Sequence, residues 1–428
     1  MKKIIYTSLL SLGIMVSMPS CETDFDNPNA PNSDLVLQET NGLLGSIVGL
    51  EYQYSVGGAS SVYTSISGAG FSAMELTLLN AGNAELAALL NGGSSVAPSN
   101  SVVTNLWTNL NLVRSNAQKV IDNAQNAAPA ETADAIRAYG LFYKALSIGT
   151  MTQFWENVTV ETGVNQEFVS REQGLQVAVS SLQEAASLIG TQVPANVLNT
   201  VGNHIDLPNA IQALIARYQL MLGNHSEAIA AASVVDRGST SVFIYDNVAQ
   251  NPVFRSSLTT NNVYDVLPDF GLTGALAPDP ADGRIAFYLE GNEANGKGFF
   301  TADEASIPIY VPGEMDLIIA EAHAREGQAA QAVTALDVVR TKTGAEDAFG
   351  LGAGLSAYTG ATDQASLLTE IYKNRCIEMY MSGLKLEDSR RFGRPGPGDA
   401  NAERNRNWYP YPNVERDKNT NTPTDPQV

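Results

Sequence analysis

The sequence contains very little cysteine, which limits how the fold can be held together. Cys21 and Cys376 are the only two cysteines in 428 residues. Two thiols cannot form the set of bridges that stabilises a disulfide-rich scaffold. Because 44% of the residues are hydrophobic, the chain can instead bury a large core, in one large domain or in two closely packed ones.

Basic and histidine side chains are also few. The chain has 25 Lys and Arg against 45 Asp and Glu, and its net charge is −20. This balance argues against nucleic acid and anionic lipid headgroups as partners, because both require a basic face. His204, His225 and His323 are far apart and lack ligand-like spacing. We therefore expect no histidine-based metal site, no catalytic triad and no cofactor.

Only one long apolar run is present, and it lies at the N-terminus. Ile4 to Met18 is an uncharged stretch of fifteen residues that ends just before Cys21 and follows two lysines. It is shorter than the roughly 20 residues that a membrane-spanning helix needs, so it predicts a secretory signal peptide. The segment resembles a bacterial lipoprotein signal, in which residues 1–20 are removed and Cys21 carries the lipid. An ordinary signal peptide with an accidental cysteine is the alternative.

Residues 21–40 are rich in Pro, Asn and acidic side chains and read as a flexible tether. Glu22, Asp24 and Asp26 resemble the acidic export tag of surface lipoproteins in the Bacteroides group, although a solvated linker explains them equally well. We expect the folded domain to cover residues 41–428.

From there the pattern is mostly helical. An amphipathic helix is predicted around residue 215, with a buried stripe formed by Ile211, Leu214, Ile215, Tyr218 and Leu222. Gly223 and Asn224 end it, and a second helix starts near Ser226, which together make a helical hairpin.

This hairpin pattern recurs 104 residues later. Ala216, Gly223 and Ala228 correspond to Ala320, Gly327 and Ala332 at identical offsets. Small residues at matched places let paired helices approach closely, as in a tetratricopeptide unit. We predict two further helical regions, one a pair over 105–126 and 132–150, the other over 172–189 beside the 211 helix. Residues 237–312 lose the periodicity and predict a loop-rich accessory lobe, and residues 393–428 predict a C-terminal tail.

Several motifs follow one another toward the C-terminus. Residues 317–327 fit the pattern L-x-x-A-E-A-x-x-R-x-G, and residues 336–344 fit V-R-x-R-x-G apart from one lysine. Residues 375–393 follow R-x-E…E-G-x-R-x-x-D-x-x-R-W-G, and residues 410–415 follow P-I-P-x-x-E. Together they resemble the SusD/RagB family of outer-membrane nutrient-binding lipoproteins, with weaker matches at 107–116 and 135–139. The departures from the family pattern include Asn374, Cys376, Ser382 and Lys385.

The resemblance implies a mostly α protein, with a tetratricopeptide-like scaffold of helical hairpins and a loop-rich lobe. It implies an outer-membrane protein that faces the cell exterior and is anchored through palmitate or another acyl chain. Such a protein captures an oligosaccharide, or a peptide, for a SusC-like TonB-dependent transporter in nutrient uptake, and it is not an enzyme. A surface glycoside hydrolase stays open, because two of the 45 carboxylates could form a catalytic pair. So does a helical-repeat adaptor without a small ligand.

Other motif-like stretches favour structural explanations. Arg375, Glu378, Asp388 and Arg391 could suggest an acid/base pair, but charges on a packed helix need partners and no nucleophile accompanies them. Residues 291–297 nearly match a phosphate-binding loop after a strand-like 285–290, yet a glycine stands where Ser or Thr would bind magnesium, so a hairpin loop is preferred. Residues 417–421 begin like a calcium loop but lack its glycine and glutamate, which favours a polar tail.

Sugar binding would require aromatic faces on surface loops. Trp107 lies in a helical pattern and is predicted to be core. The candidate ligand contacts are Tyr52, Tyr54 and Tyr63 in a Gly- and Ser-rich loop, Trp155 in a loop after a helix, and Tyr264 in the irregular lobe.

Overall fold

The computed structural model describes residues 33–258, 263–290 and 297–427. The chain divides into two units, residues 1–36 and 37–428. Helix α2 (Ser33–Val36) belongs to the first unit, and the elements below belong to the second. The predicted signal peptide, Cys21 and most of the tether lie outside the described residues.

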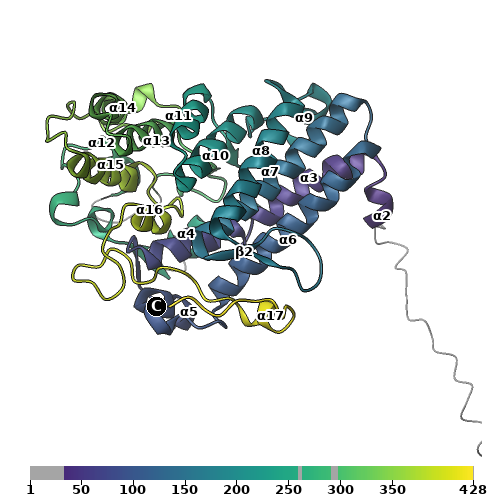
Figure 1. Ribbon diagram of the computed structural model, residues 1–428, viewed down its shortest axis with the longest axis horizontal. Helices are drawn as coiled ribbons and strands as arrows, with labels where there is room; N and C mark the ends of the chain where they lie inside the picture. Colours follow the sequence, from purple (N-terminus) through teal and green to yellow (C-terminus); the bar gives the residue numbers. More distant parts are fainter. Residues whose placement is uncertain (1–32, 259–262, 291–296, 428) are drawn as a thin grey trace, which may run out of the picture. The chain divides into compact units, whose positions relative to one another are not determined.

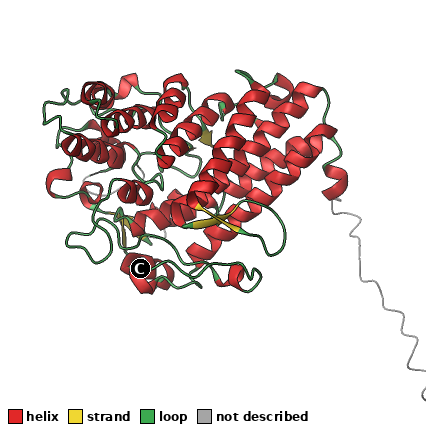
Figure 2. Cartoon of the chain, in the orientation of Figure 1, coloured by secondary structure: helices red, strands yellow, loops and turns green. Residues whose placement is uncertain are grey.

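The larger unit is mostly helical, as predicted (Figure 2). Its N-terminal half contains α3 (Thr40–Ser55), α4 (Ser61–Ser72), α5 (Ala84–Asn91), α6 (Ser101–Asn123), α7 (Ala130–Phe154), α8 (Arg171–Ile189) and α9 (Ala195–Val201). Its C-terminal half contains α10 (Leu207–Leu222), α11 (His225–Val234), α12 (Gly283–Tyr288), α13 (Pro312–Arg325), α14 (Ala329–Thr341), α15 (Gln364–Glu378), α16 (Lys385–Arg391) and α17 (Asn413–Arg416).

Helix α7 is the centre of the core. Nearly all its side chains after Arg137 are buried, because α6 and α8 pack along it and α3 and α10 also contact it. A helix that is apolar on every side must be surrounded in this way. Polar N-caps define where the two neighbouring helices begin. The side chain of Asn100 accepts hydrogen bonds from the N–H groups of Val102 and Val103 in α6, and Ser170 forms a capping box with Gln173 in α8.

The predicted helical hairpins are confirmed. Helices α10 and α11 pack against each other, α13 and α14 form the second pair, and α11 contacts α13 (Figure 1). Gly223 (φ +79°) and Gly327 (φ +72°) occupy the two turns in left-handed conformations, which glycine adopts without steric cost. The other predicted helices correspond to α6, α7 and α8, and α8 does pack beside α10.

The described residues form three two-stranded antiparallel sheets, two of which join segments far apart in the sequence. Strand β1 (Leu76–Leu78) pairs with β5 (Tyr264–Val266), β2 (Asn157–Thr159) with β3 (Phe168–Ser170), and β4 (Val242–Phe243) with β6 (Ile307–Pro308). Leu76 lies opposite Val266, so the β1–β5 pair ties the irregular lobe to the end of α4. Between 237 and 312 the described elements are short, as expected for a loop-rich lobe.

One local prediction is wrong. Residues 285–290 do not begin a strand, because Asp282 caps the backbone N–H of Arg284 and starts α12. The described part of the predicted C-terminal tail packs back onto the rest of the protein. Tyr409 and Tyr411 are buried, and Asn419 donates a hydrogen bond of 3.0 Å to the carbonyl of Gln166. Among the described residues, none of the helices is both long and apolar enough to span a bilayer.

Candidate functional site

The three tyrosines predicted on one loop lie on two helices. Ser60 caps α4, so the connection after α3 is a short turn and the loop prediction is wrong. Tyr52 is 55% exposed at the end of α3. Tyr54 is buried, with its hydroxyl 2.9 Å from Thr150 Oγ1, and burial raises its pKa to about 12. Tyr63 is partly buried on α4. Only Tyr52 offers a largely open ring face.

Trp155 and Tyr264 are fully buried. Trp155 ends α7, but its indole N–H donates to the carbonyl of Pro410 at 3.0 Å, and its ring packs edge-on against Trp107 at 4.8 Å. The C-terminal segment therefore covers the position that we expected to be open. Trp107 is core, as predicted. Tyr264 lies in β5 with its ring edge-on to Phe71 at 5.5 Å. Neither Trp155 nor Tyr264 presents a face to solvent.

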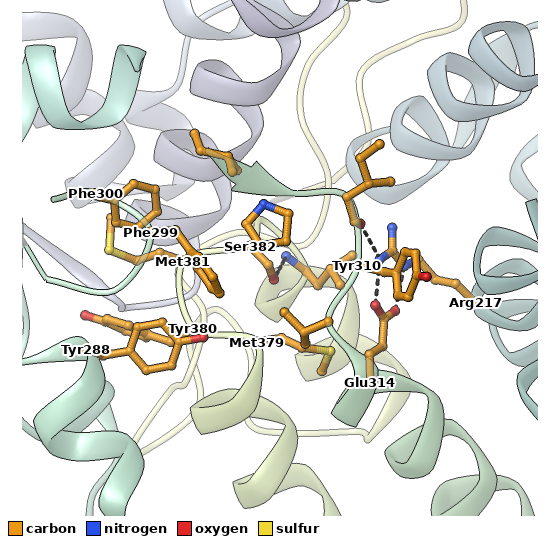
Figure 3. A pocket seen from close by; sticks show the side chains of 15 residues that line it. Arg217, Tyr288, Phe299, Phe300, Tyr310, Glu314, Met379, Tyr380, Met381 and Ser382 are labelled. Carbon is orange, nitrogen blue, oxygen red and sulfur yellow. Dashed lines mark hydrogen bonds and ion pairs between the residues drawn. The ribbon is translucent and has the colours of Figure 1, made fainter. Parts of the chain in front are cut away.

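An interior cavity of about 50 Å³ lies between α10, α13 and the segment before α16. Aromatic side chains, Tyr288 and Tyr380 among them, gather at one side of it, and Arg217, Tyr310 and Glu314 lie at the other (Figure 3). Arg217 and Glu314 are buried and hydrogen-bonded to each other twice at 2.6 Å. Because the guanidinium of Arg217 and the carboxylate of Glu314 bind each other, these groups are not free to bind a sugar hydroxyl. We interpret this cavity as part of the core.

A larger cleft opens between the irregular lobe and the segment after α16. Its volume is about 920 Å³, against about 50 Å³ for the interior cavity. Its walls are residues 267–276 except Phe270, residues 394–395 and 400–403, and the single residues Met74, Thr369 and Lys385. We call it the open cleft. None of the five predicted aromatic contacts lines it.

The backbone around the open cleft is strained. Six described non-glycine residues have positive φ, and Met74 (56°), Asp269 (54°), Phe270 (60°) and Asn401 (59°) are in or next to the cleft wall. Each such conformation costs on the order of 1–3 kcal/mol, and this strain concentrates at binding sites and switches. The clustering marks the open cleft as the best candidate site.

Close packing holds this strained wall in place. Gly271 also has positive φ, and a Cβ there would lie 1.9 Å from the carbonyl oxygen of Met74, so no other residue fits. The N–H of Leu267 donates to the carbonyl of Glu75 at 2.7 Å, which continues the β1–β5 ladder into the wall. The wall is therefore set before any ligand arrives.

The polar groups of the open cleft include an amide, a hydroxyl and several charges. Asn401 and Thr273 supply the first two, and both can bond sugar hydroxyls. Arg394 and Glu403 form a bidentate pair with distances of 2.9 and 3.1 Å from Nε, which makes them electrically neutral together. Lys385 lines the cleft as well. The sequence signal that could have indicated this site is the Asp-Phe-Gly turn inside the irregular lobe.

The charged residues near the C-terminus form a buried network, in keeping with their structural interpretation. Asp388 accepts hydrogen bonds of 2.8 Å from Arg375 and Arg391, and Arg391 reaches Glu321 on α13 at 2.8 Å. Burial alone would raise the pKa of Glu321, but Arg391 and Arg375 lower it to about 2. A second buried cluster contains Glu378, Asp282, Arg284 and Lys342.

The histidines are dispersed, as their sequence spacing indicates. His204 contacts Glu51 at 2.8 Å, His225 contacts Glu326 at 2.5 Å, and His323 bonds with Gln328. Within the described part of the chain, no group of three or more His, Cys, Asp or Glu side chains could hold a metal ion. The stretch 291–296, which resembled a phosphate loop, is outside the described residues.

Comparisons with known proteins support the resemblance to the SusD/RagB family. Residues 292–427 match the sequence model of the SusD family. No curated protein matches the chain in sequence. Solved structures with a similar fold include a SusD superfamily protein from Bacteroides thetaiotaomicron, with 16% identity and a TM-score of 0.70 over 91% of this chain and 100% of the other. A SusD-like carbohydrate binding protein from Bacteroides vulgatus has 15% identity and a TM-score of 0.67 over 83% and 84% of the two chains. A laminarin binding SusD-like protein has 14% identity and a TM-score of 0.62 over 91% and 99%.

The resemblance inferred from the C-terminal motifs is thus confirmed. At 13–16% identity the structural matches establish the fold, while the sequence match covers the C-terminal third of the chain. The chain carries the SusD family signature over residues 292–427, and its described part has the fold of the SusD superfamily.

Proposed function

We propose that this chain is a glycan-binding lipoprotein of the cell surface, which captures an oligosaccharide in the open cleft and delivers it to a SusC-like TonB-dependent transporter. No catalytic step is part of this role. A lipid on Cys21 would tether the protein to the outer membrane, facing the cell exterior.

The observation that carries the proposal is the open cleft itself. It is roomy enough for several sugar units, its wall is pre-set by strained backbone, and Asn401 and Thr273 supply hydrogen-bonding groups. Two proteins with the same fold are named for carbohydrate or laminarin binding, which supports a glycan as the ligand class. Tyr52 would act as a peripheral stacking contact on α3 rather than as part of the cleft.

Side-chain deletions in the cleft test this location. Asn401→Gly removes the amide but keeps the left-handed backbone, and Thr273→Val removes the hydroxyl at nearly constant volume. Each should weaken affinity for the cognate glycan by about two- to tenfold, which is the loss of one hydrogen bond. Asn247→Gly, at an exposed position outside the cleft lining, is the control. Isothermal titration that finds all three variants equal to the parent would place the site elsewhere.

Binding is distinguished from hydrolysis by incubating the pure protein with a glycan that it binds, chosen from a panel of glycans and peptides. A binding protein leaves the chain-length distribution of the glycan unchanged, whereas a glycoside hydrolase shortens it. A peptide-binding protein would retain peptides and no glycan from the same panel, and a helical-repeat adaptor would retain neither.

The lipid anchor is tested by Cys21→Ala. The acyl chains supply the membrane affinity, so this variant should fold normally and leave the membrane fraction. Unchanged fractionation would contradict the anchor. For the transporter, tagged protein isolated from detergent-solubilised outer membranes should bring down a TonB-dependent β-barrel identified by mass spectrometry. Its consistent absence would contradict the delivery role while leaving glycan capture intact.

A further inference from the structure

Lys385 is a buried ammonium in the wall of the open cleft. The side chain starts α16 and is only 4% exposed. Its Nζ donates hydrogen bonds to two main-chain carbonyls, at 3.1 Å to Phe270 and at 3.4 Å to Met74. Among the described residues, no carboxylate oxygen lies within 4.0 Å of this nitrogen. Lys385 therefore has no direct counterion.

An arrangement of this kind is costly unless something else compensates the charge. A buried lysine is rare without an anionic partner, because removal of its charge from water is not repaid by neutral groups alone. An ammonium also has three donors, and only two are used here. The third donor and the missing negative charge both suit an anionic group that enters from the cleft.

The two carbonyls that hold Lys385 belong to strained residues. Met74 and Phe270 both have positive φ, and Gly271 is packed against the Met74 carbonyl. The two strained residues thus fix the position of the Lys385 Nζ atom beside the cleft. This arrangement is expected of a group that is preorganised to recognise a ligand.

None of the acidic groups near Lys385 among the described residues forms an ion pair with it. Asp269 in the cleft wall lies beyond 4.0 Å of its nitrogen, and Glu403 is paired with Arg394. Asp388 is already bonded to Arg375 and Arg391. Glu75 is buried, one of its oxygens has no partner among the described residues, and burial raises its pKa to about 7 despite the opposing effect of Lys385. A carboxyl of this kind is largely uncharged in mildly acidic solution. The repulsion of a polyanion by the net charge of −20 is screened beyond about 8 Å at physiological salt, so local contacts decide.

We infer that the glycan held in the open cleft carries an anionic group, the carboxylate of a uronic acid or a sulfate ester, which binds the ammonium of Lys385. This inference rests on the proposed function and adds the ligand class. The competing explanation is that Lys385 only braces the two strained carbonyls, with no contact to ligand.

Paired polymers distinguish the explanations. Full-length protein is titrated with polygalacturonate, with the same polymer after reduction of its carboxylates to alcohols, and with a sulfated galactan and its desulfated form. We expect one acidic member to bind at least about tenfold more tightly than its neutral partner, and the pair that shows the preference identifies carboxylate or sulfate. The preference should weaken as salt is raised.

Variants of Lys385 complete the test. Lys385→Met keeps the aliphatic stem and should abolish the preference for the acidic polymer, whereas Lys385→Arg should retain most of it. A purely bracing lysine predicts a lower melting temperature for Lys385→Met but an unchanged ratio of the two dissociation constants, which would overturn the inference. Binding of neutral glycans only would also overturn the inference of an anionic ligand, but it would leave the proposed glycan-binding function intact. Binding of no glycan at all would contradict both the inference and the proposed function.

Discussion

Arg217 of α10 and Glu314 of α13 are joined by two hydrogen bonds of 2.6 Å in the interior of the protein. Arg217 also donates to the carbonyl of Ile309 at 2.9 Å. Burial would lower the pKa of Arg217, but the Glu314 carboxylate outweighs it and raises the pKa. The pair links the first repeated hairpin to the second. At the 104-residue offset Arg217 corresponds to Glu321, so each repeat buries a charge at the same helical position, with opposite sign.

We predict that Arg217→Met lowers the free energy of unfolding by about 3–5 kcal/mol. The variant leaves Glu314 buried without its partner, and an uncompensated buried charge is strongly destabilising. The matched control is Arg137→Met, which breaks a pair with Glu184 of similar length (2.7 Å) whose side chains are 40% and 43% exposed. That change should cost no more than about 1 kcal/mol. Urea denaturation measures both, and equal losses would contradict a special role for the buried pair.

The second prediction concerns Glu75 and pH. Its pKa is about 7 in the folded protein, mainly through burial, against 4.5 in an unfolded chain. Below pH 4.5 the carboxyl is protonated in both states. Between pH 4.5 and 7 the unfolded chain releases this proton while the folded chain keeps it, so the free energy of unfolding falls as pH rises. Above pH 7 the full penalty is present, on the order of 3 kcal/mol.

Glu75→Gln should therefore be more stable than the parent at pH 8, with the difference disappearing near pH 4.5. Glu304→Gln, at an exposed position, controls for the loss of one carboxylate. Denaturation curves collected from pH 4.5 to 8 provide the measurement. Parallel pH profiles for parent and Glu75→Gln would show that this carboxyl does not titrate as we expect.

Local periodicity was sufficient to predict the repeated hairpins of the helical scaffold, although it missed α3 and α4. The stripe around Ile211 and the 104-residue repeat indicate α10, α11, α13 and α14, because a helix buries one face at fixed spacing whatever lies far away in the sequence. Strand β1 was not predicted, since its partner β5 lies almost 190 residues later and three residues carry little periodicity. The same limit explains the mistaken strand at 285–290.

Exposure of individual side chains depends on long-range packing, and here the sequence was a poor guide. Trp155 follows a helix and has the local features of a loop residue, but the carbonyl of Pro410, 255 positions later, bonds its indole. The open cleft was missed because its defining feature is positive φ, which Met74 and Phe270 adopt although their residue types rarely do. Asp269, followed two residues later by Gly271, was the local sign of this turn.

The third prediction uses the turn of the second hairpin. Gly327 has φ +72°, and a Cβ there would meet no other atom within 4 Å, so any effect of substitution is backbone strain alone. Gly327→Val should destabilise the protein by about 1–2 kcal/mol, because a β-branched residue disfavours the left-handed region. Gly49→Ala is the control: it lies inside α3, has equally open space, and should raise stability by roughly 0.5–1 kcal/mol. Equal melting temperatures for the parent and Gly327→Val would contradict a constrained turn.

The last prediction concerns Tyr52 and Tyr54, two neighbouring tyrosines that the sequence analysis predicts as ligand contacts of the same kind. Tyr52 is exposed, so Tyr52→Ala should leave the melting temperature nearly unchanged and, if its ring stacks on the glycan, weaken affinity by several-fold, since one aromatic contact is worth on the order of 1 kcal/mol. Tyr54 is buried, bonded to Thr150 and packed 5.4 Å from Phe243, so Tyr54→Ala should instead cost about 3–5 kcal/mol of stability. Calorimetric titration and melting curves on both variants provide the measurements. Unchanged affinity in Tyr52→Ala would confine glycan recognition to the open cleft, and an unaltered melting temperature in Tyr54→Ala would contradict its place in the core.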